Sequence, residues 1–284
     1  CFHPILFSGV KKITGKNNVE RALIKAIKND IAIYAVHTAL DNHQRGVNKV
    51  FCDALGLVNT KILIPKENYI YKLVTYTVPE NLEQLRTALF NAGAGSIGNY
   101  ENCSFNSQGF GTYQGNADSN PAVGAVGEFV EAQEIKVEVT FEKHLESKIL
   151  NALFKNHIYE EVAYEIYSLQ NRHQNIGLGM IGELDQPMPE KELLLFVKDK
   201  MQAEGIRHTA FTGKQVRKVA VLGGSGSFAI KSAIAAGADA FLTADLKYHQ
   251  FYEAEGKLLL ADIGHFESER YIKNYIANYL ESHG

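Results

Sequence analysis

The chain has 284 residues, of which 45% are hydrophobic and 21% are charged, and its formal net charge is −3 at pH 7. This composition is ordinary for a globular protein, and the length suggests roughly two domains. The scattered Lys and Arg residues do not favour a nucleic-acid-binding face, and no apolar run approaches the roughly 18 residues of a membrane span.

The cysteine content points to a reducing compartment. Cys1, Cys52 and Cys103 are far apart and do not have the spacing of a metal-binding motif. An odd number of dispersed cysteines, with no visible signal peptide, predicts a cytoplasmic protein. The chain opens without a methionine, in what reads as the end of a buried strand, so we expect native sequence to precede residue 1.

The first segment, residues 1–68, has the pattern of an α/β unit. A helix is predicted from Val19 to Lys28, and an apolar strand from Ile31 to Val36. Runs that are apolar on both faces are typical of strands inside a parallel sheet, because helices cover both sides of such a sheet. A further helix, from Val47 to Leu55, is expected to end at Gly56.

The second segment, residues 69–170, has the order β-α-β, loop, β-α-β. This order predicts a ferredoxin-like α+β domain. A Gly/Ser/Asn-rich stretch from Asn106 to Gly127 is expected to be a long loop, and such loops are often functional or mobile. The predicted strands are Tyr71–Val78, Asn99–Phe105, Ile135–Phe141 and Glu161–Ser168, with one helix after Pro79 and another at Leu145–Phe154.

The third segment, residues 171–284, returns to the α/β pattern. The predicted strands are Val219–Leu222, Ala240–Thr243 and Lys257–Leu260, and the predicted helices are Ser227–Ala236 and Tyr271–Leu280. The first and third segments are therefore expected to form one discontinuous α/β core, into which the ferredoxin-like domain is inserted.

The strongest chemical signal is His265 with Glu269, which follow an apolar strand. These residues are four apart, so a helix that begins at His265 presents both side chains on one face of its first turn. An imidazole and a carboxylate so placed are suitable metal ligands, although most such pairs are ordinary surface residues.

Two other predicted strands also lead into a histidine. His37 and Asp41 are four apart after the predicted strand Ile31–Val36, and an opening apolar run ends at His3. Ligands of open α/β sheets bind at the carboxyl ends of the strands, so three such ends indicate a metal site at that edge.

Two further motifs are each open to two interpretations. Asp245 and His249 follow the strand Ala240–Thr243, and His249 is a candidate general acid or base; alternatively Asp245 caps a helix and His249 is a surface residue. The backbone amides of the turn Gly223–Ser227 suit a phosphate-binding site, and its sequence matches a loose dinucleotide fingerprint. It fits equally well a turn whose role is to pack a helix against a strand.

These pieces resemble the NGG-interacting-factor-three-like family, whose members are often labelled GTP cyclohydrolase I type 2 homologues. The middle segment looks like the PII/CutA-like domain that some members carry as an insertion. The motifs that carry the resemblance are His3-Pro4-Ile5-Leu6-Phe7, His37-Thr38-Ala39-Leu40-Asp41, Gly46-Val47-Asn48, Gly224-Ser225-Gly226-Ser227, Gly237-Ala238-Asp239, Thr243-Ala244-Asp245-Leu246-Lys247-Tyr248-His249, Gly264-His265 and Ser268-Glu269.

The resemblance implies a site for two divalent metal ions (Zn, Fe or Mn) in each subunit of a ring, commonly a homohexamer. The ligands carried over are His3, Asp41, His265 and Glu269. The family usually has two adjacent histidines before the proline, whereas Phe2 stands at the first of these positions here and cannot bind a metal. One of the two metals therefore loses a ligand, and it is expected either to bind weakly or to use water or His37 instead.

The resemblance further implies hydrolysis of a nucleotide-like substrate by metal-activated water, with His37 and His249 as candidate catalytic side chains. A non-enzymatic regulatory, metal-sensing or scaffold protein is the alternative, because a PII/CutA-like insert and a ring also suit that role. A dinucleotide binder that uses Gly224 and Gly226 is a third possibility.

Overall fold

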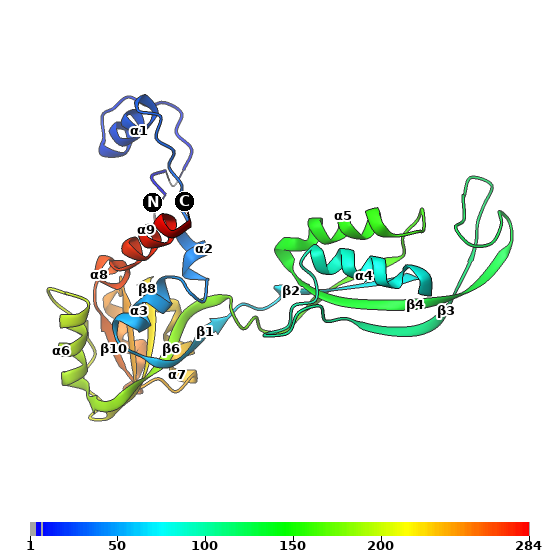
Figure 1. The fold of residues 1–284 in the computed structure, drawn as a ribbon. Coiled ribbons are helices and arrows are strands. Elements are labelled where there is room, and N and C mark those ends of the chain that lie inside the picture. The colour runs from blue at the N-terminus through cyan, green and yellow to red at the C-terminus, as the bar shows by residue number, and fades with distance from the viewer. Residues whose placement is uncertain (1–3, 7, 284) are drawn as a thin grey trace. The chain divides into compact units, whose positions relative to one another are not determined.

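The computed structural model of the protein describes residues 4–6 and 8–283 (Figure 1). The chain divides into two compact units, each with its own sheet. Residues 1–65 and 175–284 form one, here called the core unit, and residues 66–174 form the other, here called the inserted unit. Both combine helices with a sheet, so the expectation of a mixed α/β chain is confirmed. Among the described residues, no helix has the length and apolar character needed to cross a membrane.

The core unit is built on a six-stranded sheet in the order β1-β6-β8-β9-β10-β7. The central strands β8, β9 and β10 pair in parallel, in line with the α/β pattern expected of the third segment, while β1, β6 and β7 join antiparallel. The strand bounds are β1 Val58–Pro65, β6 Gly177–Pro189, β7 Arg207–His208, β8 Gln215–Ser225, β9 Ala240–Ala244 and β10 Leu259–Asp262.

Helices cover both faces of the central strands. Side chains of α3 (Val47–Ala54) and α6 (Glu190–Lys200) pack on one face, against Val219 and Leu242. On the other face, α7 (Ile230–Ala235) packs against Phe241 (Figure 1). Successive strand residues point to opposite faces, so every residue of β9 and β10 is buried. The other core-unit helices are α1 Asn18–Lys28, α2 His37–Asp41, α8 His265–Glu269 and α9 Ile272–His283.

The strand predicted at Ile31–Val36 is wrong. In the described part of the chain these residues form no strand, and Ile31 and Ile33 are exposed. An apolar run becomes a strand only where a neighbouring strand pairs with its N–H and C=O groups, and periodicity alone does not reveal that neighbour. Sequence patterns also missed β1, β6 and α6, which complete the sheet and cover it.

The inserted unit has an antiparallel sheet in the order β3-β4-β2-β5, with α4 (Leu82–Asn91) and α5 (Glu146–Asn156) packed on one face. This is the strand order of a ferredoxin-like βαββαβ arrangement. The strand bounds are β2 Ile70–Thr77, β3 Phe105–Gln114, β4 Phe129–Glu142 and β5 Tyr164–Leu169.

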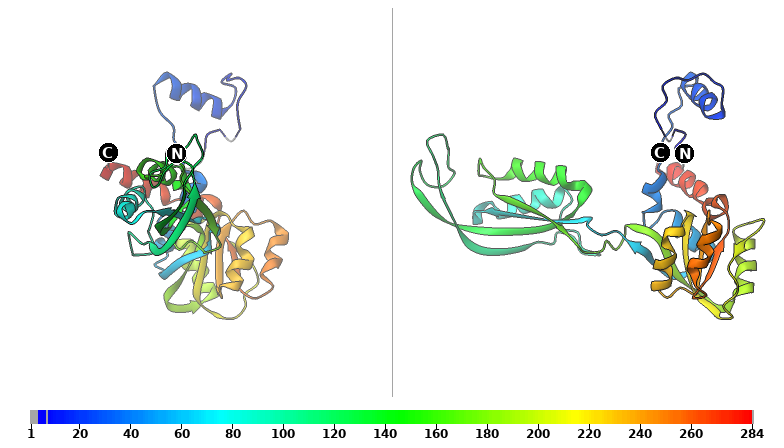
Figure 2. Two further views of the ribbon diagram at one scale, coloured as in Figure 1. Left: turned by 90° about the vertical axis from the view of Figure 1, so that its right-hand side faces the viewer. Right: turned by 180° about the vertical axis from the view of Figure 1, so that it is seen from behind.

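One strand of the inserted unit lies later in the chain than the sequence analysis predicted. The strand predicted at Asn99–Phe105 begins only at Phe105, and it continues to Gln114 through residues expected to be loop. Ten residue pairs join β3 to β4, and this ladder outweighs the low β-propensity of Gly, Ser and Asn. Figure 2 shows the two paired strands running beyond the ends of α4 and α5 to the loop at residues 115–128.

Candidate metal centre

The candidate site lies at the carboxyl ends of β9 and β10. These strands pair in parallel, with Thr243 opposite Asp262, so the segments that follow them emerge side by side. Asp245 follows β9 and His265 follows β10, and Nδ1 of His265 lies 2.7 Å from Oδ2 of Asp245. The parallel register thus brings together two side chains that are twenty residues apart in the sequence.

Helix α8 adds a second carboxylate. It begins at His265, as predicted, because Gly264 adopts φ +95 and turns the chain out of the strand. Nε2 of His265 lies 3.4 Å from Oε1 of Glu269. Two ligands on one cation, with bonds of about 2.0–2.2 Å at a tetrahedral angle, are about 3.4 Å apart. The spacing of these two atoms therefore suits a shared metal ion.

Asp245 orients the ring of His265. Because Nδ1 is engaged by this carboxylate, Nε2 is the nitrogen that faces Glu269. A carboxylate behind a histidine is the usual support of a histidine metal ligand, since it fixes the tautomer and the ring orientation. The sequence suggested a pair of Asp245 with His249 instead. The backbone of Asp245 has φ +55, which turns its side chain toward His265.

Asp41 approaches from the N-terminal segment, at the end of the short helix α2. Burial by itself lowers the pKa of the His265 imidazole, but the hydrogen bond and charges of nearby carboxylates outweigh it and raise that pKa. These carboxylates belong to Asp245, Glu269 and Asp41. The structure thus brings the charge of Asp41 close enough to act on His265.

The buried Asn48 joins the N-terminal segment to the glycine-rich turn. Its Nδ2 donates to the backbone oxygen of Asp41 at 3.0 Å, and its Oδ1 accepts from the Gly223 amide at 3.0 Å. The next amide, of Gly224, donates to Oγ of Ser268 at 2.9 Å. Since both amides are used inside the protein, these contacts favour the packing interpretation of the turn over a phosphate or dinucleotide site.

A side chain at Gly224 would be unfavourable. A Cβ atom there would lie 2.8 Å from Oε1 of Glu269 and 3.1 Å from Nε2 of His265, and the residue has φ +70. The turn therefore forms a wall directly against the two proposed ligand atoms, a role that its sequence did not reveal.

The remaining predicted residues are placed as follows. His37 opens α2, with φ +33, and is partly buried, whereas His249 is exposed on a 3-10 turn at Tyr248–Ala254. His3 and Phe2 lie outside the described residues. Within residues 4–6 and 8–283, no group of three or more His, Cys, Asp or Glu side chains is arranged to hold a metal ion.

Comparison with known proteins places the chain in a family. The profile of the Duf34/NIF3 (NGG1p interacting factor 3) family matches residues 1–284. The chain belongs to this family.

Relatives of this NIF3-family chain match along almost its whole length. A Bacillus subtilis (strain 168) protein named GTP cyclohydrolase 1 type 2 homolog is 40% identical over 282 residues, which cover 99% of this chain and 75% of that protein. The Halalkalibacterium halodurans protein of the same name is 39% identical, with 98% and 75% covered. The crystal structure of a Bacillus cereus protein related to NIF3 is 35% identical, with a TM-score of 0.80 and coverage of 99% and 76%.

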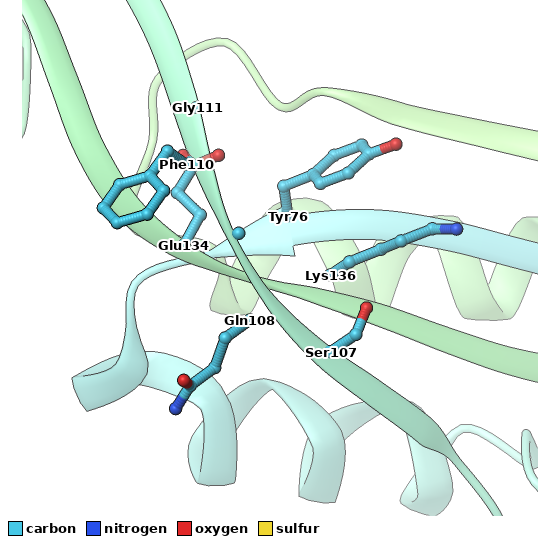
Figure 3. A pocket seen from close by; sticks show the side chains of 8 residues that line it. Tyr76, Ser107, Gln108, Phe110, Gly111, Glu134 and Lys136 are labelled. Carbon is cyan, nitrogen blue, oxygen red and sulfur yellow. The ribbon is translucent and has the colours of Figure 1, made fainter.

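The inserted unit of this family member has a cavity of its own, of about 360 Å³, along β3 (Figure 3). Tyr76, Glu134 and Lys136 are among its lining residues. Glu134 accepts a hydrogen bond from the Tyr159 hydroxyl at 2.8 Å, and Nζ of Lys136 lies 3.0 Å from Oε1 of Glu138. These charged groups already have partners, one in the loop after α5 and one on β4, so the cavity offers fewer available polar groups than the edge of the core unit.

Proposed function

We propose that this NIF3-family chain is a metal-dependent hydrolase that acts on a nucleotide-like substrate. The observation that carries the proposal is the His265–Glu269 pair, with 3.4 Å between Nε2 and Oε1 and Asp245 behind the ring. The name shared by the relatives, GTP cyclohydrolase 1 type 2 homolog, suggests the substrate class.

The residues proposed to hold the metal ions are His3, Asp41, His265 and Glu269. Imidazole and carboxylate donors suit zinc, iron or manganese. A bound metal pair would supply an activated water and polarise the substrate. In this scheme Asp245 keeps Nδ1 of His265 protonated, Gly224 closes one wall of the site, and Asn48 holds the backbone of Asp41. His37 and His249 are the proposed proton-transfer groups.

Metal content tests the first half of the proposal. Elemental analysis of purified protein should give about two metal ions per chain, and His265→Ala should lose at least one of them. His208→Ala is the matched control, because His208 is an exposed histidine of the same unit and its variant should keep the metal. Equal metal content in all three proteins would contradict the assignment of His265.

Turnover tests the second half. Metal-loaded protein should hydrolyse GTP or a related nucleotide, and Glu269→Gln should abolish this without unfolding the protein. Glu267→Gln, a change of the same chemistry in the same helix, should retain it. If the wild-type chain binds metal but is as inert as Glu269→Gln on all nucleotides, the regulatory or metal-sensing alternative is correct.

We also propose that the chain assembles into a ring, as its family resemblance implies. Light scattering should give a mass six times that of the chain. A monomeric mass at micromolar concentration would contradict the ring.

A further inference from the structure

Asp262 is a buried carboxylate between the two segments that carry Asp245 and His265. It is the last residue of β10 and is only 5% exposed. A buried carboxylate needs hydrogen-bond donors or a positive charge, and here the donors come from both segments.

Asp262 accepts hydrogen bonds from two backbone amides, one next to Asp245 and one next to His265. Its Oδ2 accepts from the Leu246 amide at 2.9 Å, and its Oδ1 accepts from the Gly264 amide at 3.1 Å. Leu246 directly follows Asp245, and Gly264 directly precedes His265.

Arg207 completes the arrangement. Its guanidinium forms an ion pair with Oδ2 of Asp262 and also donates to the Leu246 carbonyl oxygen at 3.0 Å. The side chain of Arg207 is 64% exposed, so it neutralises the buried charge from the surface. Arg207 and Asp262 thus hydrogen-bond to the carbonyl oxygen and to the amide of Leu246, respectively.

The backbone at Asp245 needs this support. Asp245 has φ +55, and the left-handed region is unfavourable for a residue with a side chain, whereas Gly264 adopts φ +95 without that cost. Hydrogen bonds from the adjoining amides to one rigid carboxylate stabilise both turns at once. The orientation of the His265 ring then depends on them, because Asp245 is its partner at Nδ1.

We propose that Asp262 is a positioning residue, which sets the ring orientation of His265 by fixing both backbone ends of the Asp245–His265 pair. Its consequence for metal binding rests on the proposed function. Its consequence for the geometry of the pair does not, since that geometry is given by the contact between the two side chains themselves. Supporting groups behind metal ligands typically change metal affinity by about 10–100-fold.

The test compares Asp262→Asn with Asp239→Asn. Asp239 precedes β9 at its opposite end, where Oδ2 accepts from the amides of Arg217 and Lys218 at 2.9 and 2.8 Å. It is therefore a carboxylate that supports the backbone away from the site. Both variants should lower the melting temperature. Only Asp262→Asn should weaken Zn²⁺ binding in a competition titration, by about 10-fold or more, and lengthen the Nδ1–Oδ2 distance of the pair in a metal-free crystal structure.

The outcomes separate the two proposals. If Asp262→Asn folds with unchanged Zn²⁺ affinity and unchanged pair geometry, the positioning role is overturned. If wild-type protein binds none of Zn²⁺, Fe²⁺ and Mn²⁺, the proposed function fails, and the crystal structure alone decides the role of Asp262. If Asp262→Asn does not fold, Arg207→Ala replaces it, because it removes only the exposed partner. That variant should show the same two changes to a smaller extent, and its equality with wild type would overturn the proposal.

Discussion

In the core unit, side chains pack on both faces of β8, β9 and β10, whereas in the inserted unit α4 and α5 cover a single face of the sheet. The burial of β9 and β10 is continuous, and that of β4 alternates. A strand buried on both faces has only its ends for polar side chains, so chemistry collects at the edge of the sheet. A strand with one open face distributes its charged groups along its length, where they pair with neighbours such as Lys136 and Glu138.

The largest expected difference between the units concerns their cores. Phe241→Ala removes a fully buried ring from β9 and should reduce the free energy of unfolding of the core unit by about 3–5 kcal/mol. Phe110→Ala, in β3 of the inserted unit where the residue is 74% exposed, should change stability by less than about 0.5 kcal/mol. Calorimetry of both variants checks this, and similar losses would show that the two units do not differ in this way.

Two glycines with similar backbone angles sharpen the comparison. Gly224 and Gly127 have φ +70 and +80, but a Cβ atom at Gly127 would meet nothing within 4 Å. Gly127→Ala should therefore cost only the left-handed strain, about 1–2 kcal/mol. Gly224→Ala should cost more and should also weaken Zn²⁺ binding, because the methyl group would press on Glu269. Chemical denaturation and Zn²⁺ titration of both variants measure these effects. Equal effects would show that Gly224 does not form a wall of the site.

Two buried asparagines, one in each unit, allow a further comparison. Asn48→Ala leaves the Gly223 amide without its acceptor and should cost about 1–3 kcal/mol, together with a loss of Zn²⁺ affinity through Asp41. In the inserted unit, Nδ2 of Asn81 donates to Oγ1 of Thr77 at 3.2 Å. Asn81→Ala should destabilise that unit without changing Zn²⁺ binding. Unchanged Zn²⁺ affinity in Asn48→Ala would show that the link to Asp41 does not support the site.

The smallest expected effect is a pH dependence of the inserted unit. Burial lowers the pKa of His157 below its ordinary value of 6.5. The unfolded chain then binds a proton more readily than the folded one, so the stability of this unit should fall as the pH drops through 6.5. Urea unfolding at pH 7.5 and pH 5.5 measures the fall, and His157→Gln should make it smaller. A fall of the same size in that variant would assign the effect to other groups.

Local patterns predicted several elements because the information lies within a few residues. The apolar runs of β9 and β10 mark strands, and the spacing of His265 and Glu269 fits a helix that begins at His265. The alternation of β2 and β4 identified the sheet of the inserted unit. In each case the residues that form the element also carry the signal.

Other features were wrong or invisible because their cause lies elsewhere in the chain. The apolar residues of Ile31–Val36 do not form a strand in the described part of the chain, and the glycine-rich β3 does so through its pairing with β4. Asp245 was paired with His249 by spacing, and the left-handed backbone turns it to His265 instead. Asp262 and Asn48 gave no signal of their own, since their importance comes from the backbone groups they join.

The sequence by itself determined the class of the fold, the parallel centre of its main sheet and the His265–Glu269 pair, because each depends on short-range periodicity and on residues four apart. Only the tertiary structure decided which carboxylate orients His265, that Asp41 comes near it, and that Gly224 packs against both. Those relations depend on strand register and on backbone dihedral angles, which arise when distant segments pair and bury their polar groups.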